Sequence, residues 1–339
     1  MRAAAPEWNA LAAAQRSPFL TVEWLSAWWD SFGDGEPEVL TLREDGALRA
    51  AALLGRSGTR LAAPANDHSG DWDVLAADED ARGRLWGRVA RDGGPVLALP
   101  AMHEAAAERL TREVLRPAGY RVVAERGPES PYLELPGSYE DLLAAKSRNF
   151  RSQLGRRRRG LEREGEVVFR TTRGGPDLDR DLDEMLRVEA AGWKSSEGTA
   201  ILSDERTQRL YRSFAHVAAE RGWLRLHLLE LDGRAIAADY SCVFAGGEFL
   251  LKTGFDEDWS RLSPGLVLRG EVLRSAIEEG LGFYDFLGGP DHYKLRWTEE
   301  LRARVTLRAF RGPRGLGPYL YRSRLRPALK AVRDRRRAD

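Results

Sequence analysis

Two stretches of the chain alternate apolar and polar residues on either side of an Asp-Gly pair. The first is VLTLREDGALRAAAL (39–53), and the second is HLLELDGRAIAADY (227–240). Such alternation places one side of a strand in a core, and Asp-Gly favours a tight two-residue turn. Each stretch therefore predicts a β-hairpin. The spacing between Asp45 and Asp232 is too long for a solenoid repeat and is typical of a duplicated domain.

In the second half of the chain, segments of helical and strand periodicity follow one another. The predicted helices span about 138–164, 176–193, 203–221, 265–280 and 290–300, and the predicted strands span 166–172, 223–231, 234–244, 248–254, 283–288 and 302–310. This order predicts a mixed α/β domain with a strand–helix–strand unit near its end. The stretch RGPESPYLELPGSYED, rich in proline and glycine, predicts the domain boundary. We expect domains over 1–135 and 136–312 and a basic tail over 313–339, which forms a docked helix or is partly disordered.

Composition limits the class of protein. The chain has 339 residues, of which 42% are hydrophobic and 31% charged, and it has a single cysteine, Cys242. No apolar run is long enough to span a membrane, and the N-terminus lacks the apolar core of a secretory signal. These features predict a soluble cytoplasmic protein without a disulfide framework. The five histidines are scattered and the usual zinc motifs are absent, so no metal site is expected.

Charge is distributed unevenly along the chain. Residues 1–145 carry 15 basic and 23 acidic groups, whereas residues 146–339 carry 38 basic and 29 acidic groups. The second half would therefore attract an anionic ligand, such as a coenzyme phosphate or RNA. Arginine supplies 48 of the 53 basic residues, which is typical of a GC-rich genome, so that an arginine run is weaker support for a binding site than usual.

The stretch RLSPGLVLRGEVLRSAIEEG (261–280) predicts a helix that opens on Ser263-Pro264-Gly265 after a strand and a loop. Backbone N–H groups and the positive end of the helix dipole would face an anion at that point. Gly265 would let a phosphate approach the backbone. The alternative is an ordinary helix start, in which glycine marks a turn.

A second candidate is GFYDFLGGPDHYKLRW (282–297), where Asp285 lies in the middle of a strand. A strand of an α/β sheet is covered on both faces, so we expect Asp285 to be desolvated close to the carboxyl end, where such sheets bind ligands. The alternative is a buried ion pair between Asp285 and Lys294. Tyr293 and Trp297 are four residues apart and are expected to pack into the core, although Tyr293 is also a catalytic candidate.

Two charged residues lie on apolar helix faces. Glu189 falls within the apolar stripe of the helix over 176–193 and is followed by Gly192-Trp193-Lys194. It is either functional, solvent-exposed in the last turn or paired with an arginine. Arg157 lies near the centre of the stripe of the basic helix KSRNFRSQLGRRRRGLER (146–163). We expect Arg157 to meet an acidic partner or a ligand phosphate, and the rest of the run to be a solvated basic face.

Together these segments resemble GNAT-superfamily acyltransferases of the cellulose-biosynthesis CelD/BcsL type, which are related to Fem-type peptidyltransferases. The similar elements, in order, are the basic helix, EAAGWKSSEGTA, the second hairpin, LLKTGFDEDWSRLSPGLVL and FYDFLGGPDHYKLRW. SPFLTVEWLSAWWDSFG (17–33) also resembles the opening of such chains. The resemblance implies two tandem GNAT-like domains, the first of them degenerate.

The resemblance also implies acyl-CoA, such as acetyl-CoA, as co-substrate. Its pyrophosphate would lie on the turn R-L-S-P-G-L, formed by Arg261, Ser263, Gly265 and Leu266 among others. Many GNAT enzymes have Q/R-x-x-G-x-G/A there, and Pro264 removes one N–H donor relative to that pattern.

Direct transfer to an amine requires a base, donors for the oxyanion and a phosphate site. The expected catalytic residues are Asp285, Glu189 and Tyr293, with N–H groups of the strand over 248–254 serving the oxyanion. Lys294 would bind a phosphate or a substrate carboxylate. The residues expected at the acceptor pocket are Trp193, Lys194 and Arg157.

Three functions are therefore compatible with the sequence. The first is N-acyl transfer from acyl-CoA to an amine of a small molecule or of a cell-envelope or polysaccharide precursor. The second is Fem-type aminoacyl transfer from a charged tRNA, which the basic second half favours. The third is a non-catalytic binding protein on a GNAT fold, suggested by Pro264 and by the degenerate first domain.

Overall fold

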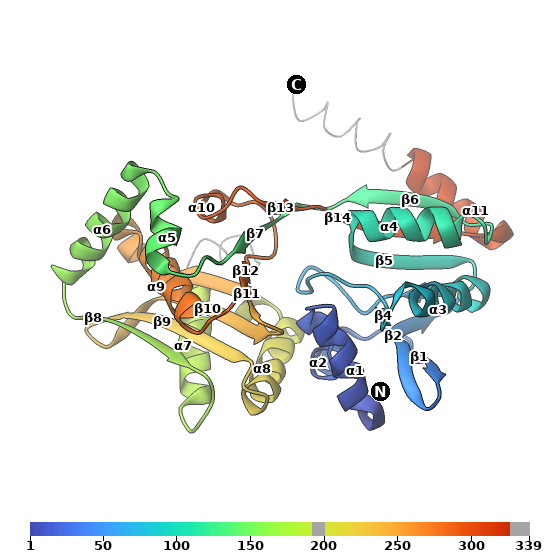
Figure 1. Cartoon of the computed structure of the whole chain (residues 1–339), viewed down its shortest axis with the longest axis horizontal. Coiled ribbons are helices and arrows are strands. Elements are labelled where there is room, and N and C mark those ends of the chain that lie inside the picture. Colours follow the sequence, from blue (N-terminus) through green and yellow to red (C-terminus); the bar gives the residue numbers. More distant parts are fainter. Residues whose placement is uncertain (192–200, 326–339) are drawn as a thin grey trace. The chain divides into compact units, whose positions relative to one another are not determined.

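The structure is a computed structural model that describes residues 1–191 and 201–325. The chain forms two compact units, each built of helices and a seven-stranded sheet (Figure 1). Unit 1 comprises Met1–Trp29, Gly33–Pro128 and the chain from Ala303 onward, and unit 2 comprises Asp30–Phe32 and Glu129–Arg302.

Unit 2 contains most of the elements predicted for the second half of the chain. Its strands are β7 (Ser130–Glu134), β8 (Val167–Thr172), β9 (Leu224–Leu231), β10 (Arg234–Phe244), β11 (Gly247–Phe255), β12 (Phe283–Asp285) and β13 (Leu301–Arg302). Its helices are α5 (Tyr139–Ala144), α6 (Arg148–Glu162), α7 (Leu178–Ala190), α8 (Glu205–Glu220), α9 (Pro264–Glu278) and α10 (His292–Leu295), with short turns η4 (Ile201–Ser203) and η5 (Glu257–Leu262). The predicted helix over 138–164 is two helices, because the Ser147 hydroxyl accepts a hydrogen bond from the Phe150 N–H and starts α6 anew.

The sheet of unit 2 has the order β13-β7-β12-β11-β10-β9-β8. Helix α9 and the hydrophobic residues of α5 and α6 cover one face, and their core includes Tyr284 of β12 and Phe286 just after it. Helix α7 packs on β10 and β11. Neighbouring residues of a strand point to opposite faces, so Asp285 lies on the face away from α9.

Unit 1 is built in a similar way. Its strands are β1 (Glu36–Glu44), β2 (Ala47–Ser57), β3 (Arg60–Ala62), β4 (Leu75–Ala76), β5 (Val96–His103), β6 (Arg121–Arg126) and β14 (Arg304–Phe310). Its main helices are α1 (Ala5–Ala14), α2 (Val22–Phe32), α3 (Glu79–Asp92), α4 (Glu104–Leu110) and α11 (Gly312–Leu320). The predicted tail therefore begins as a helix.

The strand orders of the two sheets correspond and confirm the predicted duplication. The order β1-β2-β3-β5-β14-β6 in unit 1 matches β9-β10-β11-β12-β7-β13 in unit 2, with β8 added beyond β9. In each unit, two parallel strands are joined through one long helix, α3 or α9. Both Asp-Gly turns adopt positive φ angles, 49° and 82° at Asp45-Gly46 and 50° and 77° at Asp232-Gly233, as tight hairpins require.

The predicted last strand of the second domain lies in the other sheet. Strand β14 pairs with β5 and β6 of unit 1, so the assignment of residues 302–310 to the second domain was wrong. Apolar alternation predicts that a segment is a strand but does not identify its partner. In unit 2 the corresponding place beside β12 is taken by β7, which comes from the predicted boundary segment. Arg304 is buried and forms an ion pair with Asp71, which fixes β14 in unit 1.

Helix α7 approaches the backbone of β11 closely at Gly254. A Cβ on Gly254 would lie 2.5 Å from Cα and 3.0 Å from the backbone nitrogen of Glu189, so α7 would have to move. We expect Gly254→Ala to lower the free energy of unfolding by about 2–3 kcal/mol. At Gly137 an added Cβ would meet no atom within 4 Å, and Gly137→Ala is the matched control. Denaturant unfolding measures both, and equal stability of the two variants would contradict this packing.

Candidate active site

The parallel strands β11 and β12 part near the centre of unit 2. Their register pairs are Gly247–Phe283, Glu248–Tyr284 and Phe249–Asp285. Strand β12 ends at Asp285, whereas β11 continues to Phe255, and residues 251–255 are partly exposed. We call the place where β11 passes the end of β12 the divergence. A sheet that opens in this way can offer backbone N–H and C=O groups to a ligand.

In unit 1 the chain itself fills the corresponding place. After β3, the Ala63 N–H donates to the Ala98 carbonyl at 2.9 Å, and the Trp72 N–H donates to the Ala101 carbonyl, also at 2.9 Å. The two helices also differ at their starts. Helix α3 begins with Asp78-Glu79-Asp80, whereas the first turn of α9 has no acidic residue. The positive end of α3 is therefore already compensated by carboxylates, and unit 2 is the better place for an anion.

The start of α9 has an unusual backbone. Ser263 ends η5 and precedes α9 with a φ angle of 52°, and its side chain caps no N–H. Pro264 is the first helical residue and offers no donor, and the Leu266 N–H donates to the Ser263 carbonyl at 3.0 Å. Within the described residues the Gly265 N–H has no backbone acceptor. In the predicted phosphate turn, this N–H is the group best placed to bind an anion. The Arg261 side chain is 81% exposed.

Arg157 contacts this turn, and Arg296 lies near enough to Arg157 for their charges to interact. Arg157 donates a hydrogen bond to the carbonyl of Arg261, and Arg296 donates to Oε1 of Gln153 at 2.7 Å and stacks over Phe150. Burial and the charge of Arg157 lower the pKa of Arg296. In the described part of the chain, neither guanidinium lies within 4 Å of a carboxylate. The acidic partner expected for Arg157 is therefore not found there, and two neighbouring cations remain available to an anion.

Asp285 is 2% exposed, which confirms the predicted desolvation. Its Oδ1 accepts hydrogen bonds from the Ser130 hydroxyl at 3.1 Å and from the Leu287 N–H at 2.8 Å. Leu287 and Gly288 both have positive φ angles, 49° and 60°. The carboxylate thus stabilises the strained turn that follows β12. Ser130 was not predicted as a partner, because the sequence placed it in a boundary loop.

Lys294 stabilises the same turn from the other side. Its Nζ donates to the carbonyls of Leu287 at 2.9 Å and Gly289 at 3.0 Å, and lies 2.8 Å from a carboxylate oxygen of Asp291. The residue is 5% exposed. Its observed contacts are thus with main-chain oxygens and with a neighbour in sequence.

Tyr293 differs from the prediction that it packs into the core. It is 38% exposed, whereas Trp297 is 1% exposed and belongs to the core. Helix α10 is only four residues long, so helical spacing was a poor guide to which side chains it buries. Desolvation raises the pKa of the Tyr293 phenol, and the charge of Arg269 opposes this rise. The phenol therefore keeps its proton at neutral pH.

A buried ion pair lies beneath α9. Arg269 and Asp239 are 2% and 0% exposed, and Nη1 of Arg269 lies 2.9 Å from Oδ2 of Asp239. Arg269 also donates to the hydroxyl of Tyr284. Its charge and that of Asp239 both act on the pKa of Tyr293. Sequence reasoning missed this pair, although Arg269 falls within the apolar stripe of the helix, beside Leu268 and four residues before Leu273.

Glu189 is fully buried, as its place in the apolar stripe predicted. One of its carboxylate oxygens accepts a hydrogen bond from the Ile201 N–H at 2.9 Å. This contact joins α7 to η4 across the segment 192–200. Trp193 and Lys194 lie in that segment, outside the described residues.

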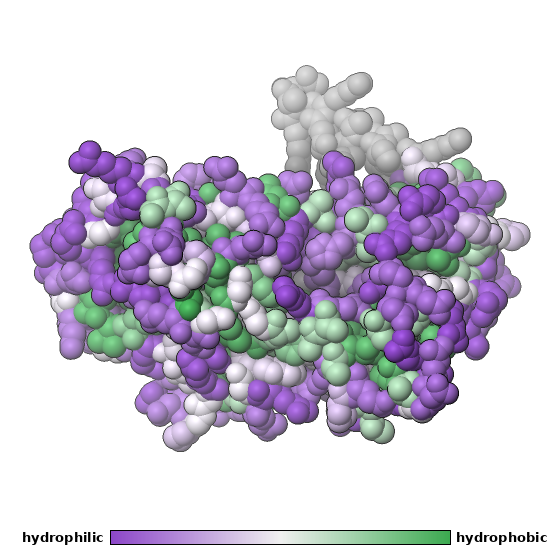
Figure 2. All heavy atoms as spheres, in the orientation of Figure 1, coloured by the Kyte–Doolittle hydropathy of each residue, from purple (hydrophilic) through white to green (hydrophobic). Residues whose placement is uncertain are grey.

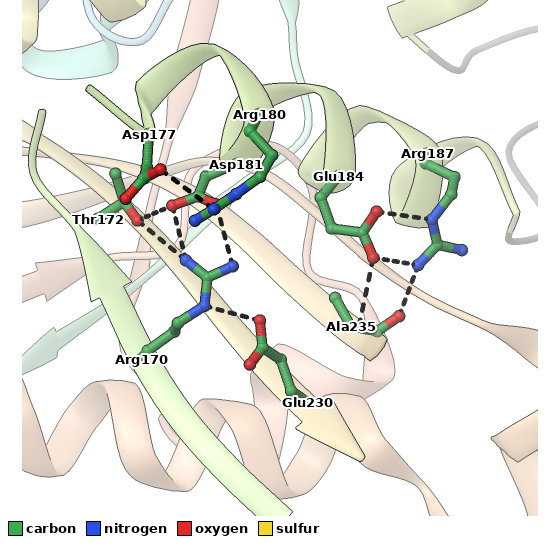
Figure 3. A network of polar contacts seen from close by, with 9 residues as sticks. All are labelled: Arg170, Thr172, Asp177, Arg180, Asp181, Glu184, Arg187, Glu230 and Ala235. Carbon is green, nitrogen blue, oxygen red and sulfur yellow. Dashed lines mark hydrogen bonds and ion pairs between the residues drawn. The ribbon is translucent and has the colours of Figure 1, made fainter. Parts of the chain in front are cut away.

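A polar network fixes α7, the helix that carries Glu189, on the sheet (Figure 3). Arg170 of β8 contacts the Asp181 carboxylate at 2.6 and 3.0 Å and the Glu230 carboxylate at 2.6 Å. Burial would raise the pKa of Asp181, but the hydrogen bonds from Arg170, Thr172 and Arg180 together with the charge of Arg170 outweigh it and lower that pKa. Arg187, further along α7, donates to the Ala235 carbonyl at 2.7 Å. The network holds both ends of the helix in place.

Neither a metal-binding cluster nor a membrane-spanning helix is found among the described residues. Among residues 1–191 and 201–325, no group of histidine, cysteine and carboxylate side chains could hold a metal ion. In the same residues, no helix combines the length and apolar character needed to cross a bilayer.

Comparisons with known proteins agree with this geometry. Residues 148–295 match the family model of the acetyltransferase (GNAT) domain. No curated protein matches the chain.

Three solved structures have similar folds at low sequence identity. FemX is 12% identical with a TM-score of 0.66, over 92% of this chain and 96% of that one. The C-terminal domain of a putative lysylphosphatidylglycerol synthetase from Agrobacterium fabrum is 15% identical with a TM-score of 0.56, over 92% of each chain. A tandem GNAT protein from the clavulanic acid biosynthesis pathway is 12% identical with a TM-score of 0.50, over 92% and 96%. The fold is thus that of a tandem GNAT protein, with the acetyltransferase match in unit 2.

Proposed function

We propose that unit 2 is an N-acyltransferase of the CelD/BcsL type, which moves an acyl group from acyl-CoA, such as acetyl-CoA, to an amine of a small molecule or of a cell-envelope or polysaccharide precursor. The observation that carries this proposal is the divergence of β11 and β12 beside the start of α9, where Arg157 and Arg296 have no carboxylate partner among the described residues. An elongated thioester with an anionic end suits this arrangement, because its phosphates can meet cations while its acyl end lies along β11.

In this proposal the anionic end is held at the start of α9. The Gly265 N–H, Arg157 and Arg296 bind the pyrophosphate, helped by Arg261 and by the backbone of Ser263 and Leu266. Lys294 does not reach a phosphate itself, because its ammonium group is already bonded within the turn after β12. It acts as a positioning residue for that turn.

The reaction joins the amine nitrogen to the thioester carbonyl carbon and breaks the carbon–sulfur bond. Backbone N–H groups of β11 stabilise the oxyanion, and a buried carboxylate, Asp285 or Glu189, accepts the proton of the amine. Tyr293 gives its proton to the departing thiolate. The phenol suits this role because it remains protonated at neutral pH.

The role of Tyr293 gives the direct test. We expect Tyr293→Phe to lower kcat about a hundredfold, since a positioned proton donor is lost, while the Kd for CoA is unchanged. Tyr321→Phe, at another partly exposed tyrosine, should leave kcat unchanged. Release of the CoA thiol with a panel of amines measures the rate. Equal kcat values for the two variants would exclude Tyr293 as the donor.

The second candidate is Fem-type aminoacyl transfer from a charged tRNA. The similarity of the fold to FemX and the exposed arginines of α6 favour it. The five exposed arginines of this helix are Arg148, Arg151, Arg156, Arg158 and Arg159. This function requires tRNA binding that weakens steeply as salt is raised. A thermal-shift comparison of acetyl-CoA, longer acyl-CoAs and tRNA decides between the two donors, because a ligand of the folded state raises its Tm.

A further inference from the structure

Three of the large hydrophobic residues exposed on the described chain lie together near its C-terminal end. Leu316, Leu320 and Tyr321 are 41%, 38% and 49% exposed and lie within two turns of helix. On the visible face of the molecule, hydrophobic residues lie among more numerous hydrophilic ones (Figure 2). A contiguous exposed apolar strip of this kind marks a binding surface more often than a scattered residue does.

Helix α11 docks on unit 1 through the face that carries Gly315 and Tyr319. A Cβ on Gly315 would lie 2.9 Å from the Pro95 carbonyl oxygen, so the helix touches the backbone there. The ring of Tyr319 contacts that of Phe310, with centroids 6.1 Å apart, and Arg322 lies 3.5 Å from Glu125 just beyond the helix. These contacts fix the rotation of α11. Leu316 and Leu320, which are one turn apart, therefore point away from unit 1.

The same end of the chain is strongly basic. Residues 311–339 contain ten arginines and lysines and two aspartates. Arg314 is exposed on α11 itself. Apolar side chains flanked by arginines match the boundary of a bilayer whose headgroups are negatively charged. A second copy of this chain would bring two like charges together, and a nucleic acid would leave the leucines without an apolar partner.

We propose that the exposed side of α11 and of the residue after it, formed by Leu316, Leu320 and Tyr321 with Arg314, binds the surface of a membrane rich in anionic lipid. The leucines enter the boundary between headgroups and acyl chains, and Arg314 meets the lipid phosphates. The attachment is peripheral, and it is independent of the acyl transfer proposed for unit 2.

Sedimentation with lipid vesicles tests this surface in the full chain. We expect binding to vesicles of equal parts phosphatidylglycerol and phosphatidylcholine to exceed binding to pure phosphatidylcholine vesicles at least about tenfold, and to weaken as salt is raised. The double variant Leu316→Ser/Leu320→Ser keeps every charge and should bind anionic vesicles at least about tenfold more weakly, since two apolar side chains are lost.

Val39→Ser/Val168→Ser is the matched control, because these valines are 41% and 38% exposed on other elements. It should bind like the wild type, and circular dichroism verifies that all variants are folded. Equal binding of both double variants to anionic vesicles would overturn the proposal, as would failure of the wild type to bind them. Binding of tRNA that is unaffected by the leucine changes, with no vesicle binding, would instead assign the basic segment to nucleic acid.

Discussion

Arg269→Met is expected to lower the free energy of unfolding by about 3–5 kcal/mol, because it leaves a buried carboxylate without its counter-charge. Asp239 is fully buried, and among the described residues its ion-pair partner is Arg269. A carboxylate in that position must either remain charged in a medium of low polarity or take up a proton. Both outcomes cost free energy in the folded state.

The double variant Arg269→Met/Asp239→Leu separates the cost of an unpaired charge from the cost of lost packing. It should recover most of the stability, because apolar side chains of similar size can replace a buried ion pair. Arg212→Met, which removes an ion pair with Asp183 at the surface, should change stability by less than about 1 kcal/mol. Denaturant unfolding measures all three. If the double variant were as unstable as Arg269→Met, the loss would come from packing and not from charge.

The second large effect is expected in ligand binding. Arg157→Ala/Arg296→Ala should raise the Kd for CoA at least about a hundredfold, since each guanidinium that contacts a phosphate contributes about 1.5–3 kcal/mol. The fold should tolerate the change. The two side chains repel each other and, in the described part of the chain, neither meets a carboxylate, so the Tm is expected to stay the same or rise.

Arg156→Ala/Arg159→Ala is the control, because it removes two exposed charges from the same helix without touching the turn before α9. Calorimetric titration with CoA at low and moderate salt gives the Kd values. The same Kd for both double variants would place the phosphates elsewhere. The basic face of α6 would then remain as the candidate site for binding an anion, which would favour the tRNA-dependent function.

Much of unit 2 could be predicted because its elements are long and regularly patterned. The two Asp-Gly hairpins predicted both the strands and the duplication. Alternation along β12 predicted that Asp285 is desolvated, and the stripe of α7 predicted that Glu189 is buried. In these segments one periodicity decides both the secondary structure and the side that is buried.

The errors concern partners and short elements. The alternating pattern of β14 is compatible with a strand of either sheet. Its place in unit 1 depends on contacts such as that of Arg304 with Asp71. In the four residues of α10 no stripe can form, so the exposure of Tyr293 and the position of Arg296 beside Arg157 were outside the reach of periodicity. The burial of Arg269 could have been predicted, since a charged residue among apolar positions of a helix is the same signal that identified Glu189.

The position of β14 in the sheet of unit 1 also limits where the chain can be divided into independent parts. A cut at the predicted boundary would leave β7 on the first fragment and β14 on the second, although each strand lies inside the sheet of the other unit. Neither fragment would own a complete sheet, and each would expose the edges from which a strand is missing. Unit 1 is also the unit that needs both ends of the chain. Unit 2 has all its strands within Glu129–Arg302, whereas the sheet of unit 1 is complete only once β14, which follows unit 2 in the chain, has been added.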